Sequence, residues 1–420
     1  MNLPAETPMA TGLSVPEAQS CILERTHPLE AEEIGLHQAL GRALAEEVRA
    51  NRDLPPYDVS AMDGYAVRAT DLVELPKALQ IIEDIKAGDT PRFPLQPGQC
   101  ARIMTGAPLP SGADTIVRVE DSRALENGWA EFPVPVKLAT DIRLRGESMR
   151  SGDTVLQAGE EITPGTVGVL AAVKQAKVKV TRKPHIAILS NGDELEALDE
   201  PVDLSKIPDS NSYALMAQVQ ALGIEPVLLG IARDKPDELA SFLKRGLEYD
   251  VLLISGGTSV GEHDHVRPTL AALGVVMHFW RVEMRPGHPI AFGTFDRTLV
   301  FCLPGNPVSS MVCFEQFVLP ALRRLMGHRH LFRRTISARL TQAVKSKQGR
   351  IEFIRAKLSR DVSGAYAATP GATQSSGDIR SMAYADALVV VPPDSDKLAA
   401  NATVQLQLLE AAIFQNAPDI

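Results

Sequence analysis

Short apolar runs alternate with amphipathic stretches through the middle of the chain. Between residues 184 and 327, runs such as HIAILS, DVLLISG and TLVFCLP alternate with stretches of helical spacing such as SYALMAQVQALG and KPDELASFLKRG. Near-continuous apolar strands between amphipathic helices are typical of a parallel sheet covered on both faces. The pattern predicts a central αβα domain with a parallel sheet over residues 183–328.

The flanking segments have different patterns. Residues 15–50 carry apolar positions at helical spacing with breaks at Pro28, Gly35 and Gly41, which predicts two helices, whereas the sequence before Val15 shows no periodicity. Thr163 followed by Pro164 predicts the start of another helix.

Short β-type runs separated by Pro, Gly and Asp fill two further segments. We expect a helical or extended N-terminal domain made of 15–50 and 146–182, a β-rich domain inserted at 51–145, and a small C-terminal β-barrel domain at 332–420. The predicted fold class is therefore multi-domain, α/β plus β.

Composition excludes several classes of protein. The chain of 420 residues carries 43 Lys and Arg against 52 Asp and Glu, a net charge of −9, which disfavours nucleic acid as a partner. Its four cysteines form no C-x-x-C pair, and no apolar run approaches the roughly 20 residues that span a bilayer. We expect a cytoplasmic protein with reduced thiols and no membrane partner.

Three unusual loops follow strands of the predicted sheet. They are Asn191–Glu194, Ser255–Asp264 and Leu303–Ser309. In open α/β sheets ligands bind at the carboxyl ends of the strands. The middle loop, S-G-G-T-S-V-G, suits a phosphate because adjacent glycines let the backbone approach a ligand, although it matches neither the Rossmann fingerprint nor the P-loop. The alternative is a tight strand-to-helix turn.

Acidic residues follow the same strands. Asp193, Glu194, Asp234 and Asp264 are expected to converge at one sheet edge, where a hard cation such as Mg²⁺ would bridge them to a phosphate. The alternative is that Asp193 and Asp234 are helix caps or turn residues. A zinc site at His263 and His265 is disfavoured because no further histidine or cysteine is spaced to complete it.

A cationic turn supplies local positive charge that the acidic chain otherwise lacks. Arg281, Arg285 and His288 lie in W-R-V-E-M-R-P-G-H-P, after a predicted strand. The alternative is a solvated turn.

Several long motifs carry a resemblance to a known family. LPPYDVSAMDGYAV at 54–67 and RIMTGAP at 102–108 lie in the inserted β domain, and S-N-G-D-E-L, S-G-G-T-S-V-G-E-x-D, R-P-G-x-P and L-P-G-N-P-V-S follow in order. Over roughly residues 15–415 the chain resembles the MoeA and gephyrin E-domain family of molybdopterin molybdenumtransferases.

The resemblance implies a fold, a reaction and a site. It implies an elongated homodimer of four-domain subunits that joins molybdate with adenylyl-molybdopterin and releases AMP. Such a reaction calls for positioning and a cation rather than a protein nucleophile. Possible partners by the same resemblance are a molybdopterin adenylyltransferase and molybdoenzymes.

The resemblance also assigns residues. Asp63 and Thr105 would reach the cleft of the other subunit, and Asp63 would join Glu194, Asp234 and Asp264 in catalysis, the last three also binding Mg²⁺. Arg355 and Ser376 would contribute to molybdate binding from the C-terminal domain. The expected positions for binding the pterin and phosphates are Asp193, Ser255, Gly256, Gly257, Thr258, Ser259, Gly261, Arg281, Arg285, His288, Pro304, Gly305, Asn306 and Pro307.

The chain departs from the family pattern in three places, and two rival functions remain. Family members often carry aspartate where Ser148 stands, threonine where Asn191 stands, and K-P-G-K-P where Arg285-Pro286-Gly287-His288-Pro289 stands. A molybdopterin adenylyltransferase shares the α/β domain but usually consists of that domain alone. A non-catalytic dimeric scaffold is disfavoured by the retained acids.

Overall fold

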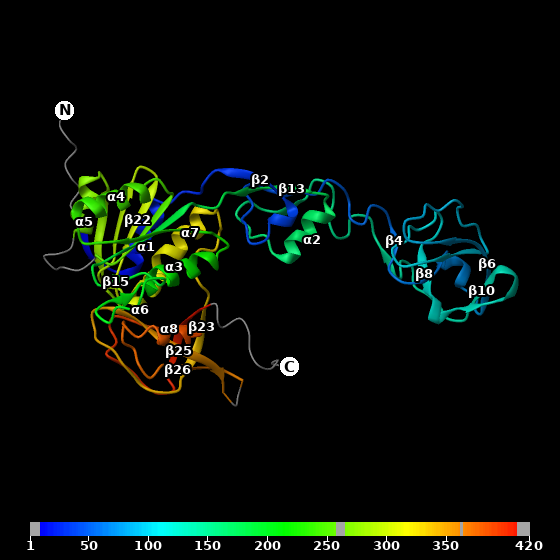
Figure 1. Ribbon diagram of the computed structural model, residues 1–420. Coiled ribbons are helices and arrows are strands. Elements are labelled where there is room, and N and C mark those ends of the chain that lie inside the picture. The colour runs from blue at the N-terminus through cyan, green and yellow to red at the C-terminus, as the bar shows by residue number, and fades with distance from the viewer. Residues whose placement is uncertain (1–8, 258–264, 362–363, 410–420) are drawn as a thin grey trace.

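The computed structural model describes residues 9–257, 265–361 and 364–409, and these form an elongated chain (Figure 1). The α/β domain and the C-terminal barrel lie together at one end, and the inserted β domain lies at the other. A narrow connecting part joins the two ends, and it contains β2 (Ala31–Gly35), β13 (Lys177–Thr181) and α2 (Pro164–Ala172). No helix in the described ranges is long and apolar enough to cross a membrane.

A seven-stranded sheet forms the centre of the α/β domain. Its order is β1 (Ala10–Leu13), β19 (Val276–Val282), β21 (Ala291–Phe295), β22 (Thr298–Leu303), β18 (Val251–Ser255), β14 (Ile186–Asn191) and β17 (Val227–Ala232). The last four strands are mutually parallel, which confirms the α/β prediction. Only β21 runs antiparallel to both its neighbours, because a tight turn with Asp296 at φ 50° folds the chain back into β22.

Helices cover both faces of this sheet. One face packs against α1 (Val15–Glu24), α3 (Ser210–Gln220), α6 (Pro307–Cys313) and α7 (Leu319–Leu325), with a π-helical turn at Phe314–Val318 joining α6 and α7. The opposite face packs against α4 (Pro236–Gly246) and α5 (Val266–Ala272). Successive residues of β14 point to opposite cores, Ile188 to the first and Leu189 to the second, as the period of a strand requires.

The connecting part differs from the sequence prediction. Only the first of the two expected helices forms, because residues 31–35 pair as β2 (Ala31–Gly35) with β13 (Lys177–Thr181). A short 3-10 turn at Leu36–Gln38 follows, and β3 (Val48–Arg49) pairs with β12 (Thr154–Leu156). The prediction for α2 (Pro164–Ala172) is confirmed, since the Thr163 hydroxyl accepts a hydrogen bond from the Thr166 amide at 3.2 Å.

The first helix belongs with the α/β domain rather than with the connecting part. Val15, Ala18 and Ile22 of α1 are buried in the core beneath the large sheet, and β1 extends that sheet at its edge. We therefore propose the four-part division expected from the sequence with one change, the transfer of the first helix to the α/β domain.

The inserted domain is a six-stranded sheet with short 3-10 turns at Ala69–Leu72, Val119–Asp121 and Glu126–Gly128. Its order is β8 (Thr115–Arg118), β5 (Gly64–Val67), β7 (Gln99–Ile103), β6 (Lys77–Ile85), β10 (Trp129–Phe132) and β9 (Arg123–Ala124). The small pair β4 (Val59–Ser60) and β11 (Ile142–Arg143) lies where the domain joins the connecting part.

Five strands of the C-terminal domain close into a barrel. They are β25 (Ile351–Arg360), β26 (Tyr366–Pro370), β23 (Thr335–Leu340), β29 (Thr403–Leu408) and β27 (Ala387–Val391), and β27 pairs again with β25. β20 (Met284–Arg285) from the α/β domain adds to β25 in parallel. The remaining short elements are α8 (Arg380–Ala383) and the pairs β24 (Val344–Lys345) with β28 (Lys397–Leu398) and β15 (Leu195–Glu196) with β16 (Ile207–Pro208).

Candidate active site

The three loops singled out in the sequence meet at the carboxyl ends of β14, β18 and β22. The amide of Gly256 donates to the carbonyl of Leu303 at 3.1 Å, which joins the second loop to the third. The side-chain amide of Asn191 donates to the carbonyl of Ala232 at 3.1 Å, which joins the first loop to the end of β17. The parallel register of these strands therefore brings the predicted loops together, as the sequence argument required.

Two adjacent glycines allow the close approach of these loops. Gly256 has φ +95°, and a Cβ there would lie 2.3 Å from the carbonyl oxygen of Asn191. Gly257 has φ +63°, and a Cβ there would lie 2.1 Å from a methyl group of Val266. Both backbone strain and contact with neighbours exclude a larger residue. The predicted positions Thr258, Ser259, Gly261 and Asp264 lie outside the described residues.

Asn211, which the sequence analysis missed, connects two of the loops. Its buried side-chain amide donates to the hydroxyl of Ser255 and to the carbonyl of Gly305, both at 2.8 Å. Its Oδ1 is buried without a hydrogen-bond partner among the described residues. A buried acceptor of this kind is costly unless a donor satisfies it, so it marks a place where a ligand N–H or a water would bind. Its position in the first turn of α3 gave no motif by which to recognise it.

The third loop leads into α6, and most of its exposed surface is backbone. Pro304 is buried, Gly305 and Asn306 are exposed, and Pro307 is the first residue of the helix, where its missing N–H costs nothing. The arrangement leaves the exposed backbone of Gly305 and Asn306 beside the Gly256 loop, since Gly256 Cα lies 3.8 Å from the Cβ position of Gly305.

Two of the predicted acids come together at the ends of β14 and β17. A carboxylate oxygen of Asp193 accepts a hydrogen bond from the amide of Asp234 at 3.2 Å. Asp193 therefore stabilises the turn, which is the structural role that the sequence offered as the alternative to metal binding. Glu194 is exposed beside it and Asp234 is half-buried. Within the described ranges no three His, Cys, Asp or Glu side chains form a group that would hold a metal. Asp264, the third predicted ligand, is outside these ranges.

Two basic side chains donate hydrogen bonds to the backbone of the loop that carries Asp193 and Glu194. Arg233 donates to the carbonyl of Leu195 at 2.7 Å and to that of Gly192 at 3.3 Å, and Lys206 donates to the carbonyl of Asp193. These contacts fix the backbone of the loop without using the carboxylates of Asp193 and Glu194. Neither cation could be recognised from the sequence, because each acts on backbone carbonyls that lie 13 to 41 residues away along the chain.

Two of the basic side chains in the cationic turn, Arg281 and Arg285, contact other side chains of the protein. The Arg281 guanidinium stacks over the ring of Trp280 at 4.0 Å, and Arg267 stacks on the same ring at 3.9 Å. Arg285 lies 3.7 Å from the carboxylate of Glu352, on the first strand of the barrel. Arg281 and Arg285 are therefore oriented by fixed neighbours rather than solvated on all sides.

Both ring nitrogens of His288 have partners within the chain. Nδ1 lies 2.8 Å from the carbonyl of Val282, and Nε2 lies 3.2 Å from the guanidinium of Arg350. Since a guanidinium donates only, Nε2 accepts this hydrogen bond, and Nδ1 donates to the carbonyl of Val282. Arg350 in turn donates to the carboxylate of Glu283 at 2.7 Å. Contact between His288 and an anion would require this arrangement to change.

The barrel contributes a loop that contacts the third loop directly. The amide of Val308, at the start of α6, donates to the carbonyl of Ser376 at 3.1 Å. Arg355 lies behind this loop and donates to the carbonyl of Ser375 at 3.1 Å and to the hydroxyl of Ser381 at 3.2 Å. Burial lowers the pKa of Arg355. Its side chain lines a cleft of about 350 Å³ beside the loop.

Asp63 and Thr105 form a pair of their own in the inserted domain. One carboxylate oxygen of Asp63 accepts from the amide of Thr105 at 2.7 Å and from its hydroxyl at 2.8 Å. These hydrogen bonds lower the pKa of Asp63. The pair is exposed, and its domain lies at the opposite end of the chain from the α/β loops (Figure 1). A single chain does not bring Asp63 to the other site residues.

Comparisons with known proteins match this architecture part by part. Residues 13–173 match the "MoeA N-terminal region (domain I and II)", residues 187–324 the "Probable molybdopterin binding domain", and residues 337–409 the "MoeA C-terminal region (domain IV)". The fold and the site thus define a multi-domain protein built around an α/β domain of the molybdopterin-binding type.

Individual relatives cover nearly the whole chain. A molybdopterin molybdenumtransferase of Nostoc sp. is 39% identical over 376 residues, covering 86% of this chain and 85% of the relative. One from Staphylococcus aureus is 31% identical over 404 residues, covering 95% and 96%. A crystal structure of a molybdopterin biosynthesis MoeA protein from Pyrococcus horikoshii superimposes with a TM-score of 0.79 at 30% identity, covering 94% of this chain and 99% of that one. The chain belongs to the MoeA family of molybdopterin molybdenumtransferases, a family of enzymes.

Proposed function

We propose that this enzyme transfers molybdenum from molybdate to adenylyl-molybdopterin and releases AMP. The observation that carries the proposal is the junction of the three sheet loops with the Ser376 loop of the barrel, fixed by the hydrogen bond between Val308 and Ser376. This junction places a glycine-lined surface suited to phosphate beside a buried guanidinium suited to an oxyanion. Two anionic substrates can therefore be held side by side.

The described residues account for binding and orientation. The backbone at Gly256, Gly257 and Gly305 offers a close approach to a phosphoanhydride, and the free Oδ1 of Asn211 accepts a hydrogen bond from a pterin amine or from a bound water. Arg281 and Arg285 supply positive charge at the rim. No nucleophilic side chain is needed, because an oxygen from water or molybdate adds to a phosphorus of the phosphoanhydride while the bond to AMP breaks, and molybdenum exchanges oxo ligands, released as water, for the two dithiolene sulfurs.

The acids fit a magnesium ion. Glu194 and Asp234 would hold it, with Asp264 as a further ligand, since Mg²⁺ is usually bound through one or two carboxylates plus substrate phosphates. When bound, the ion neutralises charge on the phosphoanhydride. The exposed Glu194 carboxylate supports this assignment because no basic side chain in the described ranges pairs with it.

We also propose a homodimer in which Asp63 and Thr105 act on the partner's site. The separation of the two ends of one chain supports this arrangement. The exposed Asp63 belongs to the inserted domain, which lies at the opposite end of the chain from the α/β loops, so within one chain it cannot act on them. The Thr105 hydrogen bonds hold its carboxylate in one orientation and keep it ionised. We place the reaction in the cytoplasm, with a molybdopterin adenylyltransferase supplying the substrate and molybdoenzymes receiving the product.

AMP release is the direct test of this function. Purified protein mixed with adenylyl-molybdopterin and Mg²⁺ should release AMP only when molybdate is added. An Asp234→Asn variant should bind the adenylate and release AMP much more slowly. Release that is independent of molybdate would indicate simple hydrolysis, and synthesis of adenylyl-molybdopterin from ATP would indicate the adenylyltransferase instead; either result would overturn the proposal.

A further inference from the structure

A second cavity lies away from the proposed active site, where three parts of the chain meet. It has a volume of about 650 Å³ and is bounded by the connecting part near Arg42, by the end of α3 near Gly223, and by the 328–334 linker to the barrel. Pockets that bind small ligands usually measure about 300–1,000 Å³. The cavity is therefore large enough for a compact organic molecule.

The lining of this cavity is strongly basic in a chain whose net charge is −9. Its acidic lining is Glu161, whereas its basic lining comprises Arg42, Lys183, Arg323, Arg333 and Arg334, together with His328 and His330. With the histidines neutral the side chains that line the cavity carry a net charge of +4, from five cations and one carboxylate. Such a local excess is the feature that an anionic ligand requires.

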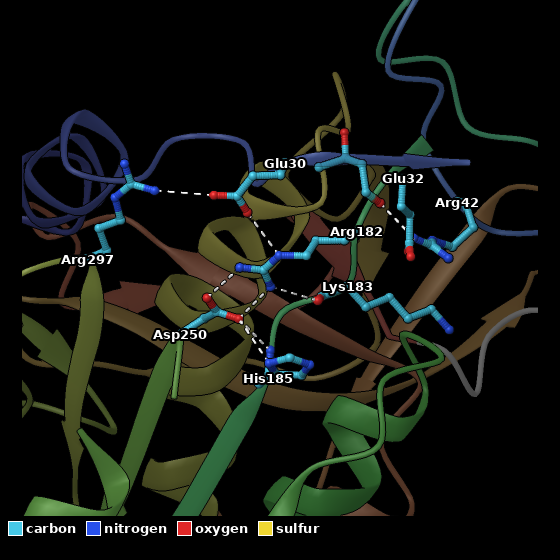
Figure 2. Close-up of polar contacts among 9 residues, drawn as sticks. Glu30, Glu32, Arg42, Arg182, Lys183, His185, Asp250 and Arg297 are labelled. Carbon is cyan, nitrogen blue, oxygen red and sulfur yellow. Dashed lines mark hydrogen bonds and ion pairs between the residues drawn. The ribbon is translucent and has the colours of Figure 1, made fainter. Parts of the chain in front are cut away.

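Ion pairs within the chain do not account for all of these cations. Arg42 pairs with Glu32 at 2.5 Å, and Figure 2 shows Lys183 extending beside this pair. Arg323 pairs with Glu161 at 2.8 Å, and Arg333 pairs with Glu315 at 2.9 Å. Within the described ranges Lys183 donates to a backbone carbonyl, that of Gly223, and to no side chain.

Two cations, Lys183 and Arg334, therefore remain for a ligand, and the surroundings of Lys183 disfavour its charged form. Among the described residues neither Lys183 nor Arg334 has a carboxylate within 4.0 Å, the limit for an ion pair. Burial and the charge of Arg42 lower the pKa of Lys183. A bound anion would offset this repulsion and raise the pKa of Lys183 again.

We propose that this cavity binds an organic phosphate, with the phosphate held by Lys183 and Arg334 and an apolar or aromatic group against the apolar part of the lining. The apolar lining includes Leu222, Leu319, Met326 and the half-exposed ring of Phe332. A guanidinium and an ammonium together match a phosphate dianion, and the exposed aromatic ring offers a stacking surface. The volume of about 650 Å³ favours a small molecule over an acidic peptide. This inference does not depend on the proposed reaction.

Chemical labelling of Lys183 tests the site separately from the active site. The full-length protein is treated with an amine-acylating reagent, and the rates at Lys183 and at the exposed Lys174 are read by mass spectrometry with ADP or inorganic phosphate present. ADP should protect Lys183 and leave Lys174 unchanged, and phosphate alone should protect at higher concentration because it lacks the stacking group. Nucleotide binding at the active site would not alter the rate at Lys183.

Matched variants complete the test. Arg334→Ser should raise the ADP concentration needed for protection by about tenfold. Arg339→Ser removes an exposed arginine five positions further along, outside the cavity, and should leave protection unchanged. Unchanged acylation of Lys183 in saturating ADP would overturn the proposal. So would protection by an acidic peptide but not by ADP, or equal protection in Arg334→Ser and wild-type protein.

Discussion

Asn211 and Gly305 are joined by a 2.8 Å hydrogen bond from the side-chain amide to the backbone carbonyl, although 94 residues separate them in the chain. The same amide holds the hydroxyl of Ser255. Asn211 thereby fixes the spacing between the glycine loop and the loop that begins α6. A substrate that bridges these loops depends on that spacing.

Asn211→Ala should weaken binding of adenylyl-molybdopterin and lower stability by about 1–3 kcal/mol, because the buried hydroxyl of Ser255 and the carbonyl of Gly305 lose their donor. Asn51→Ala is the matched control, since Asn51 makes one comparable hydrogen bond to Val173 at 2.7 Å in the connecting part. Calorimetry should show that both variants melt earlier and that only Asn211→Ala loses affinity. Equal affinity in the two variants would refute a role for Asn211 in the site.

The placement of Asp63 predicts complementation between subunits. Asp63→Ala and Glu194→Ala should each be inactive as homodimers, whereas a heterodimer of the two should contain one intact site. After subunit exchange, activity should approach a quarter of the wild-type value if mixing is random and the sites act independently. Confirmed exchange without recovered activity would show that Asp63 does not act in trans.

Arg355 is predicted to hold the Ser375 and Ser376 loop and to attract molybdate. Arg355→Lys keeps the charge but cannot make both hydrogen bonds, so the KM for molybdate should rise by about tenfold, equivalent to about 1.4 kcal/mol. Arg339→Lys, on the barrel strand β23, which does not pair with the strand of Arg355, should leave KM unchanged. A change in kcat alone, with the KM for molybdate constant, would argue against the assignment.

Buried His328 predicts an acid-sensitive fold. Burial lowers its pKa to about 4, with a further contribution from Arg323 that Glu161 opposes. In the unfolded chain the pKa is about 6.5, so as pH falls below that value the unfolded state binds a proton that the folded state does not. Stability should therefore fall between about pH 6.5 and 4 by about 1–3 kcal/mol.

Thermal midpoints across this pH range test the His328 prediction. His328→Gln should reduce the decline because it removes this ring, while His278, whose pKa burial also lowers to about 4, keeps its share. His330→Gln, at an exposed position two residues away, should retain the full decline. A decline of the same steepness in His328→Gln and wild type would show that other groups cause it.

Local sequence rules were sufficient for much of the fold. The alternation of apolar runs and helices predicted the α/β domain, and Thr163 with Pro164 predicted the start of α2, because these signals depend on neighbours within a few residues. The same periodicity failed at residues 31–35, where pairing with β13 from far along the chain overrides the helical spacing. β21 was also missed, since it is short and depends on the β22 hairpin.

The site was predictable to a lesser extent. Parallel topology alone brings the ends of β14, β18 and β22 together, so the three loops could be placed from sequence. The roles of Asn211 and Arg233 depend on contacts 38 or more residues away and left no local signal. The pattern of charges around His288 did not predict its contacts. Its ring is held by the carbonyl of Val282 and the guanidinium of Arg350, and the R-P-G-H-P motif reveals neither partner.

Transfer of molybdenum to the pterin tests the central claim most directly. Purified protein, adenylyl-molybdopterin, Mg²⁺ and molybdate are incubated together, and AMP, pterin-bound molybdenum and the activation of a molybdenum-free molybdoenzyme are measured in the same reaction. The account predicts equimolar AMP and pterin-bound molybdenum, with activation of the molybdoenzyme that requires the protein. AMP release without molybdenum on the pterin, or activation that is equal without the protein, would contradict it.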